Sequence, residues 1–140
     1  MSVEQNKAIA RRLVEEVFNQ GNVGLADEIM AADFVEHEEM PPGTPPGREG
    51  NKAATTMLRS AFPDFKATID DMVAEGDKVA LRLTWSGTQE GEFMGLPPSG
   101  NRFSIAVFDI LRLEDGKIVE HWGSMDVAGM MQQLGAPPPA

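Results

Sequence analysis

The stretch RFSIAVFDILRLEDGKIVEHWGSMD, from Arg102 to Asp126, alternates apolar and polar residues on both sides of a short turn. Alternation with a period of two is typical of β-strands that bury one face. The turn, Glu114 to Gly116, is of the kind that joins neighbouring antiparallel strands. The stretch therefore predicts a β-hairpin, and its second strand carries one of the chain's two histidines.

Two further strands are predicted upstream of this hairpin. FKATIDDMVAEG begins at Phe65 and KVALRLTWSGT begins at Lys78, and both again alternate with a period of two. A turn at Glu75 to Asp77 separates them, and the loop MGLPPSGN, from Met94 to Asn101, leads into the hairpin. The four segments together predict an antiparallel meander.

Helical spacing of apolar residues replaces this pattern before Phe65 and at the end of the chain. The first helix is predicted after the capping pair Ser2 and Gln5, and the third from Glu49 to Phe62. A short second helix is expected to carry Leu25, Ile29 and Met30, and a short C-terminal helix to carry Met130, Met131 and Leu134.

The segment between the second and third helices is not helical. Asp33 to Glu39 is predicted as a short extended segment. MPPGTPPG, from Met40 to Gly47, is predicted as a surface loop, because its prolines lack backbone donors and its glycines are flexible. We expect this loop to form the rim of a pocket.

A chain that begins with helices and continues with strands has the element order of an α+β fold. We predict a single domain over residues 1–140, with three N-terminal helices packed on a curved antiparallel sheet and a short C-terminal helix. Long strands twist and curl, so helices on the concave side would leave a cone-shaped α+β barrel. A pocket is expected between the sheet and the helices.

The composition excludes several classes of function. The net charge of −10, from 22 acidic against 12 basic residues, would repel a phosphate backbone, so no nucleic-acid partner is expected. The chain has no cysteine, which excludes disulfides and thiolate catalysis. Without an apolar stretch of membrane-spanning length, no membrane partner is expected and the expected location is cytoplasmic.

The hairpin places an acid in apolar company. Asp109 shares one face of its strand with residues that are otherwise apolar, and an isolated buried carboxylate is costly unless it is paired. On the next strand, His121 shares a face with Val119 and Met125. Counted from a turn centred on Asp115, Asp109 and His121 lie opposite each other, so an acid–base or orienting pair is predicted, with a purely structural pair as the alternative.

His37 is the other histidine, and it lies just before the proline loop among several acids. Both histidines with Asp109 or Glu36 could in principle form a site of two histidines and one carboxylate for a metal. Their spacing matches no metal-binding motif, so no metal is expected.

Four sequence motifs resemble the SnoaL-like polyketide cyclase (ester cyclase) family of the NTF2-like superfamily. They are AFPDF (Ala61 to Phe65), EGDKVALRLTWSGTQEGEFMGLPPSGNRF (Glu75 to Phe103), DGKIVEHWGSMD (Asp115 to Asp126) and QQLG (Gln132 to Gly135). The resemblance covers nearly the whole chain. It implies a cone-shaped α+β barrel and closure of a ring in a polyketide ester by an intramolecular aldol reaction, with a carboxylate moving the protons and no metal or organic cofactor.

The resemblance also implies site residues. It implies a pocket near Glu36 and His37, a polar residue at Asp109 where the family's cyclases carry a histidine, and a match of the family's histidine to His121. The family's acid–base aspartate is expected two residues after His121, where this chain has Gly123. Either Asp109 or Asp126 has therefore taken over the proton transfer, or the protein does not cyclise.

Three functions remain open. The first is a cofactor-independent cyclase, or a related lyase or isomerase, that acts on a hydrophobic carbonyl compound. Its expected catalytic residues are Asp109, His121 and Asp126, and its expected substrate-binding residues are Glu36, His37, Trp85 and Met125. Relatives with isomerase, dehydratase and epoxide hydrolase activity depend on a tyrosine, and this chain has none.

The other two functions need no catalysis. The second is a module that binds hydrophobic ligands in the same pocket. The third is an interaction protein that uses the exposed face carrying Phe108, Ile110 and Trp122. That half-apolar outer face, which also holds Arg82, Thr84 and Ser86, predicts a homodimer.

Overall fold

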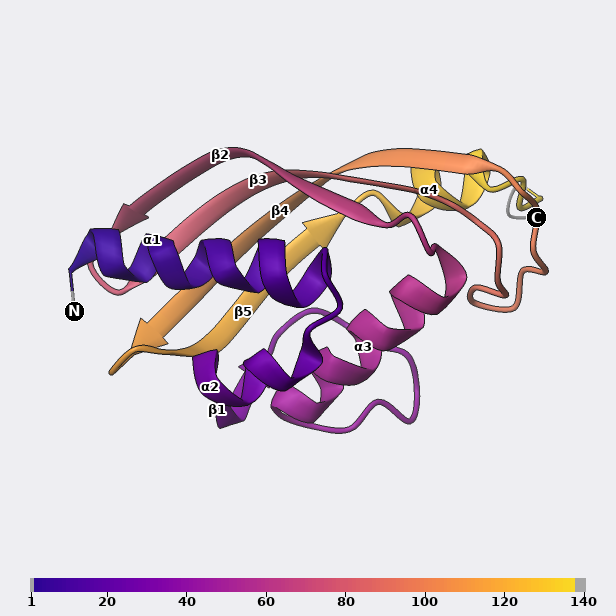
Figure 1. Ribbon diagram of the computed structural model, residues 1–140. Coiled ribbons are helices and arrows are strands. Elements are labelled where there is room, and N and C mark those ends of the chain that lie inside the picture. Colours follow the sequence, from indigo (N-terminus) through magenta and orange to yellow (C-terminus); the bar gives the residue numbers. More distant parts are fainter. Residues whose placement is uncertain (1, 138–140) are drawn as a thin grey trace.

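A computed structural model describes residues 2–137 of the chain; Met1 and residues 138–140 of the predicted domain lie outside the described residues. Its centre is a five-stranded sheet in the order β1-β5-β4-β3-β2 (Figure 1). The strands are β1 Met30–Glu36, β2 Lys66–Glu75, β3 Lys78–Thr88, β4 Arg102–Glu114 and β5 Lys117–Met125. The predicted α+β fold is confirmed, with the four long strands as an antiparallel meander.

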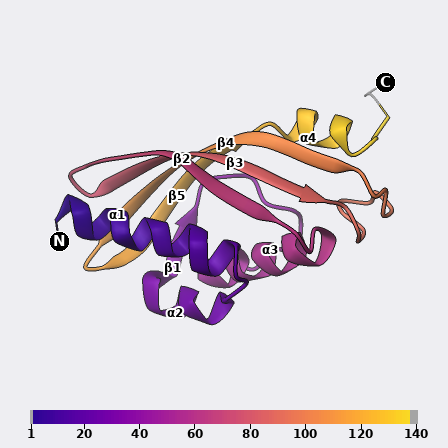
Figure 2. The ribbon, with the colours of Figure 1, turned by 45° about the horizontal axis from the view of Figure 1, so that its top comes forward.

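The three N-terminal helices, α1, α2 and α3, lie on one side of the curved sheet, as Figures 1 and 2 show. The helices are α1 Val3–Arg12, α2 Ala26–Ile29, α3 Arg48–Ala61 and α4 Val127–Gln133. The capping box of Ser2 and Gln5 opens α1, and a π-helical segment, Leu13–Phe18, continues it. A single turn of 3₁₀-helix, Val23–Leu25, precedes α2.

One strand differs from the prediction. The segment expected to be merely extended, Asp33 to Glu39, overlaps β1, which pairs in parallel with β5 and makes the sheet mixed. Met30 was expected to lie in the second helix, but it begins this strand. Such a pairing joins segments more than eighty residues apart, so it depends on tertiary packing that local periodicity does not describe.

Alternation along β4 places one face of the sheet in the core, as predicted. Every second residue from Phe103 to Leu113 is buried, and Asp109 is the one charged residue among them. From the helical side, Phe62 packs edge-on against Phe103 at a ring-centre distance of 4.8 Å and against Phe93 at 5.1 Å. Apolar burial of this kind is the main force that holds helices to the sheet.

The register of the hairpin is set by its turn and by a bulge. Glu114 pairs with Lys117 across Asp115 and Gly116, which both have positive φ as a tight two-residue hairpin turn requires. The register then shifts at Arg112/Leu113, leaving Val119 as an extra residue on β5. The predicted partner of Asp109 was therefore wrong: Asp109 pairs with Gly123, whereas His121 pairs with Leu111.

Along the described part of the chain, none of the helices has both the length and the apolar character needed to span a bilayer.

Candidate functional site

The parallel pairing of β1 with β5 brings Glu36 beside His121. The two residues are register partners, and the backbone N–H of His37 donates to the His121 carbonyl at 3.0 Å. Side chains alternate between the faces of a sheet, so Glu36 and His121 point to the concave face. Their neighbours His37 and Trp122 point away from it and stack on each other with ring centres 4.7 Å apart.

His121 is held between two carboxylates. Its Nε2 donates to Oδ1 of Asp109 at 2.7 Å, and its Nδ1 donates to Oε2 of Glu36. The predicted contact between Asp109 and His121 is thus present, although the two residues are diagonal rather than direct neighbours. Asp109 is only 8% exposed, and its side chain is hydrogen-bonded to this imidazole.

The ion pairs keep His121 protonated. Burial by itself would lower the pKa of the imidazole, but the hydrogen bonds and negative charges of Asp109 and Glu36 outweigh burial and raise the pKa to about 10. His121 is therefore an imidazolium at neutral pH. It supplies positive charge and orientation to the site rather than a proton-accepting nitrogen.

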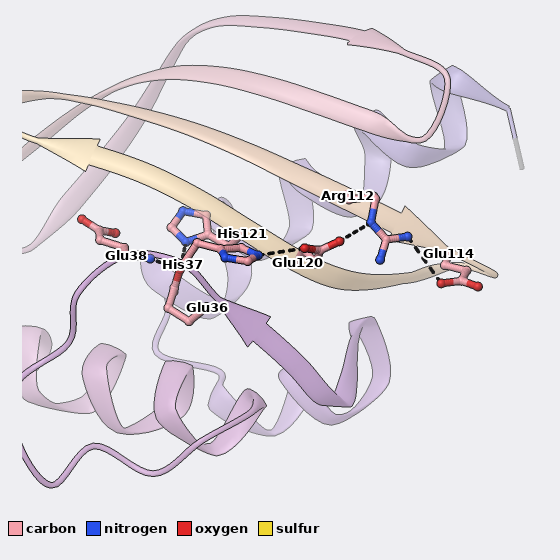
Figure 3. Close-up of polar contacts among 7 residues, drawn as sticks. All are labelled: Glu36, His37, Glu38, Arg112, Glu114, Glu120 and His121. Carbon is pink, nitrogen blue, oxygen red and sulfur yellow. Dashed lines mark hydrogen bonds and ion pairs between the residues drawn. The ribbon is translucent and has the colours of Figure 1, made fainter.

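A third carboxylate, that of Glu38, lies close to the same imidazole. Burial raises the pKa of the Glu38 carboxyl; the positive charge of His121 opposes this shift, and the charges of Asp109 and Glu36 add to it. The side chain comes from the segment that follows β1, as Figure 3 shows. Glu38 was not among the predicted site residues, because no sequence pattern distinguishes it from the neighbouring acids Glu36 and Glu39.

Three of these groups also lie at metal-binding distances. One ligand atom each from Glu36, Glu38 and His121 falls within 4.8 Å of the others. Both ring nitrogens of His121, however, donate to carboxylates, so a metal ion would have to displace a proton and one of these hydrogen bonds. We therefore interpret the cluster as carboxylates grouped around a protonated histidine, and not as a metal site.

This cluster lies at the wall of a cavity of about 200 Å³ between the sheet and the helices. Glu36, Glu38, Asp109 and His121 all line it, and most of the remaining wall is apolar. Six of the chain's nine methionines contribute, and their flexible side chains suit a cavity that adapts to a bulky ligand. They are Met30, Met40, Met57, Met94, Met125 and Met130.

Two buried polar atoms of the cavity residues lack a partner among residues 2–137. They are Nε1 of Trp85, a hydrogen-bond donor, and Oδ1 of Asn51, an acceptor. A buried polar group without a partner is costly, which makes each atom a natural contact for a polar group of a ligand. Trp85 was expected to bind substrate; Asn51 was missed, because a single amide in a helix carries no pattern of its own.

Some of the remaining predicted site residues line the cavity, and others lie outside it. Met125 and Glu36 line the cavity, as does Met40 at the start of the proline loop. His37 does not, because it follows Glu36 and so points to the opposite face, where it donates to Glu120 at 2.8 Å.

Asp126 is also outside the cavity. It is exposed, and its side chain accepts from the backbone N–H of Gly129 as the N-cap of α4. The expectation that it joins Asp109 and His121 is corrected by this geometry, because β5 ends at Met125 and the chain turns into a helix there.

A second polar network runs along the outer face. Figure 3 shows contacts that run from His37 through Glu120 and Arg112 to Glu114. The hydrogen bonds from His37 and Arg112 lower the pKa of the Glu120 carboxyl. This network is partly exposed on the outer face and none of its members lines the cavity, so it is typical of surface ion pairs.

Comparison with known protein families gives one match over most of the chain. The sequence model of the SnoaL-like polyketide cyclase family matches residues 8–134. Aklanonic acid methyl ester cyclase DauD of Streptomyces sp. (strain C5) is 34% identical over 139 residues, covering 94% of this chain and 82% of the relative. Nogalonic acid methyl ester cyclase of Streptomyces nogalater is 29% identical over 124 residues, covering 87% and 92%.

Solved structures agree with this match. TsrD from Streptomyces laurentii superposes with a TM-score of 0.88 at 34% identity, over 98% of this chain and 99% of that one. Wild-type IdmH from Streptomyces antibioticus superposes with a TM-score of 0.80 at 40% identity, over 94% and 99%.

Proposed function

The chain belongs to the SnoaL-like polyketide cyclase family, and we propose that it closes a ring in a polyketide ester by acid–base chemistry in the cavity. The observation that carries the proposal is the imidazole of His121, hydrogen-bonded on both ring nitrogens to Asp109 and Glu36 in the wall of a mostly apolar cavity. Charged groups inside an apolar cavity interact more strongly with a reacting molecule than they would in water.

The proposed reaction is an intramolecular aldol addition. A carboxylate of the cluster removes a proton from a carbon next to a carbonyl, which leaves an enolate. The enolate carbon attacks a second carbonyl carbon of the same molecule, and the resulting alkoxide takes up a proton from the carboxylic acid. Substrate and product are isomers, so the reaction needs no cofactor and no second substrate.

Two groups of this chain would stabilise the enolate or hold the substrate. The positive charge of His121 offsets the negative charge that develops when the proton leaves. Nε1 of Trp85 offers a hydrogen bond to a substrate oxygen. Trp85 lies four residues along β3 from Leu81, the pairing partner of Asp109, so the Cα atoms of Trp85 and Leu81 are roughly 13 Å apart.

The substrate class follows from the relatives. Two of them are named for cyclising aklanonic acid methyl ester and nogalonic acid methyl ester. We propose that this chain accepts a hydrophobic small molecule of that class, a methyl ester with at least two carbonyl groups to join.

Turnover of aklanonic acid methyl ester tests the proposal. The purified protein should convert it to an isomer of identical mass and different chromatographic retention, faster than buffer alone does. Asp109→Asn should reduce the rate by about 100-fold or more, because it removes a charge that holds His121 protonated. Wild-type protein that binds the ester without converting it would contradict the proposed reaction.

A second candidate function is non-catalytic binding of hydrophobic ligands, and Gly123 is the residue that favours it. The family's acid–base aspartate is expected at this position, and glycine has no side chain that could move a proton. Quenching of Trp85 fluorescence by the ester, with no isomer formed, would support this second function over the first.

A further inference from the structure

Gly123 faces the carboxylate cluster, and the space beside it is already filled. A Cβ atom added at Gly123 would lie 2.8 Å from Oε2 of Glu38, 2.8 Å from Oδ1 of Asp109 and 2.7 Å from Cε1 of His121. Contacts this short would force one of these side chains to shift. The Glu38 carboxylate, from the segment after β1, therefore lies in the space that a side chain at position 123 would need.

Glu38 also differs from the other two carboxylates in its contacts. Asp109 and Glu36 each accept a hydrogen bond from His121. Within residues 2–137, no hydrogen bond reaches the Glu38 side chain, although its backbone N–H donates to Glu36 at 3.3 Å. Its oxygens are thus available to a molecule in the cavity, which Glu38 lines.

We propose that Glu38 is the carboxylate that transfers the proton in the cyclisation proposed above, on which this inference rests. Its carboxylate takes the proton from the carbon next to the carbonyl, and the Glu38 carboxylic acid that results exchanges its proton with solvent. The enolate either takes a proton back at carbon or forms the new carbon–carbon bond, after which the same acid protonates the alkoxide. Asp109 and Glu36 are positioning residues, because they act through His121.

The electrostatics of the cluster suit this assignment. Burial and the charges of Asp109 and Glu36 raise the pKa of the Glu38 carboxyl, and the His121 imidazolium limits that rise. A carboxylate with a raised pKa is a stronger base and so takes a proton from carbon more readily. Glu38 reaches this state without losing any hydrogen bond, whereas Asp109 would have to break its bond to His121.

Deuterium uptake separates proton transfer from ring closure. Aklanonic acid methyl ester is incubated with the protein in D₂O, and its mass is followed against a protein-free control. Glu38→Gln should lower the protein-dependent uptake by about 100-fold or more. Quenching of tryptophan fluorescence should show unchanged affinity for the ester. Glu75→Gln, at the exposed end of β2, is the matched control and should keep the wild-type rate.

The outcomes distinguish this inference from the proposed function. Wild-type uptake in Glu38→Gln would overturn the assignment of Glu38 and leave the cyclase proposal standing. Neither uptake nor ring closure in the wild-type protein would contradict the cyclase proposal, and the assignment with it. A ¹³C NMR titration of the wild-type protein adds a check that needs no substrate: a Glu38 pKa at or below the ordinary glutamate value of about 4.3 would overturn the assignment.

Discussion

The imidazole of His121 keeps its proton because two carboxylates from different strands share it. Its pKa of about 10 in the folded protein lies above the value of about 6.5 for an unfolded chain. A raised histidine pKa contributes stability that is fully present below about pH 6.5 and is lost as the pH rises through about 10.

We therefore predict a loss of roughly 2–4 kcal/mol in the free energy of unfolding between pH 6.5 and pH 10. Denaturant titrations across this range measure it. His121→Gln is the control, and its unfolding free energy should change much less over the same interval. Parallel pH profiles for the two proteins would show that His121 is not the titrating group.

Folding favours the neutral form of Glu38, whereas for His121 it favours the charged form. Its raised carboxyl pKa means that the charged form is less favourable in the folded protein than in the unfolded chain. The stability it contributes when protonated is lost as the pH rises through its folded pKa. Glu38→Gln, which imitates the protonated form, should therefore be more stable than wild type at pH 7 and equal to it near pH 3. Thermal unfolding at both pH values measures this difference, and a destabilised variant at pH 7 would contradict it.

Trp85 gives a prediction that separates binding from folding. Its buried Nε1 lacks a partner among the described residues, so Trp85→Phe removes a donor that the folded protein leaves unsatisfied. We predict unchanged or slightly higher stability and about tenfold weaker binding of the ester. Calorimetry on the variant and wild type measures both quantities. Unchanged affinity would mean that the ligand does not reach Nε1.

Some residues of the site were predictable from the sequence, and others were not. The contact of Asp109 with His121 was predictable, because both residues share parity with apolar neighbours. Glu38 was not, because the conformation of a side chain just after a strand has no periodic signature. Asp126 was misassigned, since its place at the end of β5 allowed both a site residue and a helix cap.

At the scale of elements, the strands and their turns were predictable, and the register was not. Alternation fixed which residues of β4 face the core, but the bulge at Val119 decided which residue of β5 each one meets. The bulge lies before His121, so His121 keeps the inward direction that alternation predicts. The parallel pairing of β1 could not be predicted from local patterns, and it is the pairing that supplies Glu36.

The proline loop is packed against the start of α3 more tightly than its composition suggests. A Cβ at Gly50 would lie 2.3 Å from the carbonyl oxygen of Pro45, which is backbone and cannot easily move aside. We predict that Gly50→Ala destabilises the protein by about 1–3 kcal/mol, measured by chemical denaturation. Gly24→Ala, whose Cβ would meet only Asn22 at 3.8 Å, is the control and should change little. Equal effects of the two substitutions would contradict this account of the loop.

At the scale of the whole molecule, the convex side of the sheet carries exposed apolar residues. Val73, Phe108 and Ile110 are 64%, 53% and 41% exposed, whereas Trp122 is partly covered by its stack on His37. Sheet pairing places Val73, Ala80, Ile110 and Trp122 in one row across the strands. Such a patch is typical of a surface that a second copy covers.

We therefore predict a homodimer formed through this face. Sedimentation at micromolar concentration should give twice the monomer mass of 15.2 kDa. Phe108→Lys should shift the protein toward monomer without loss of fold, because the side chain is exposed. A wild-type monomer at this concentration would exclude the proposed interface.

The most direct test of the whole account is a crystal structure of the Glu38→Gln variant with aklanonic acid methyl ester. The account predicts the ester inside the cavity, with the carbon that loses its proton about 3–3.5 Å from the side chain at position 38. A substrate oxygen should accept from Nε1 of Trp85. An ester bound on the outer face, or held in the cavity with its carbonyl groups turned away from residue 38 and His121, would contradict the proposal that ring closure takes place at this cluster.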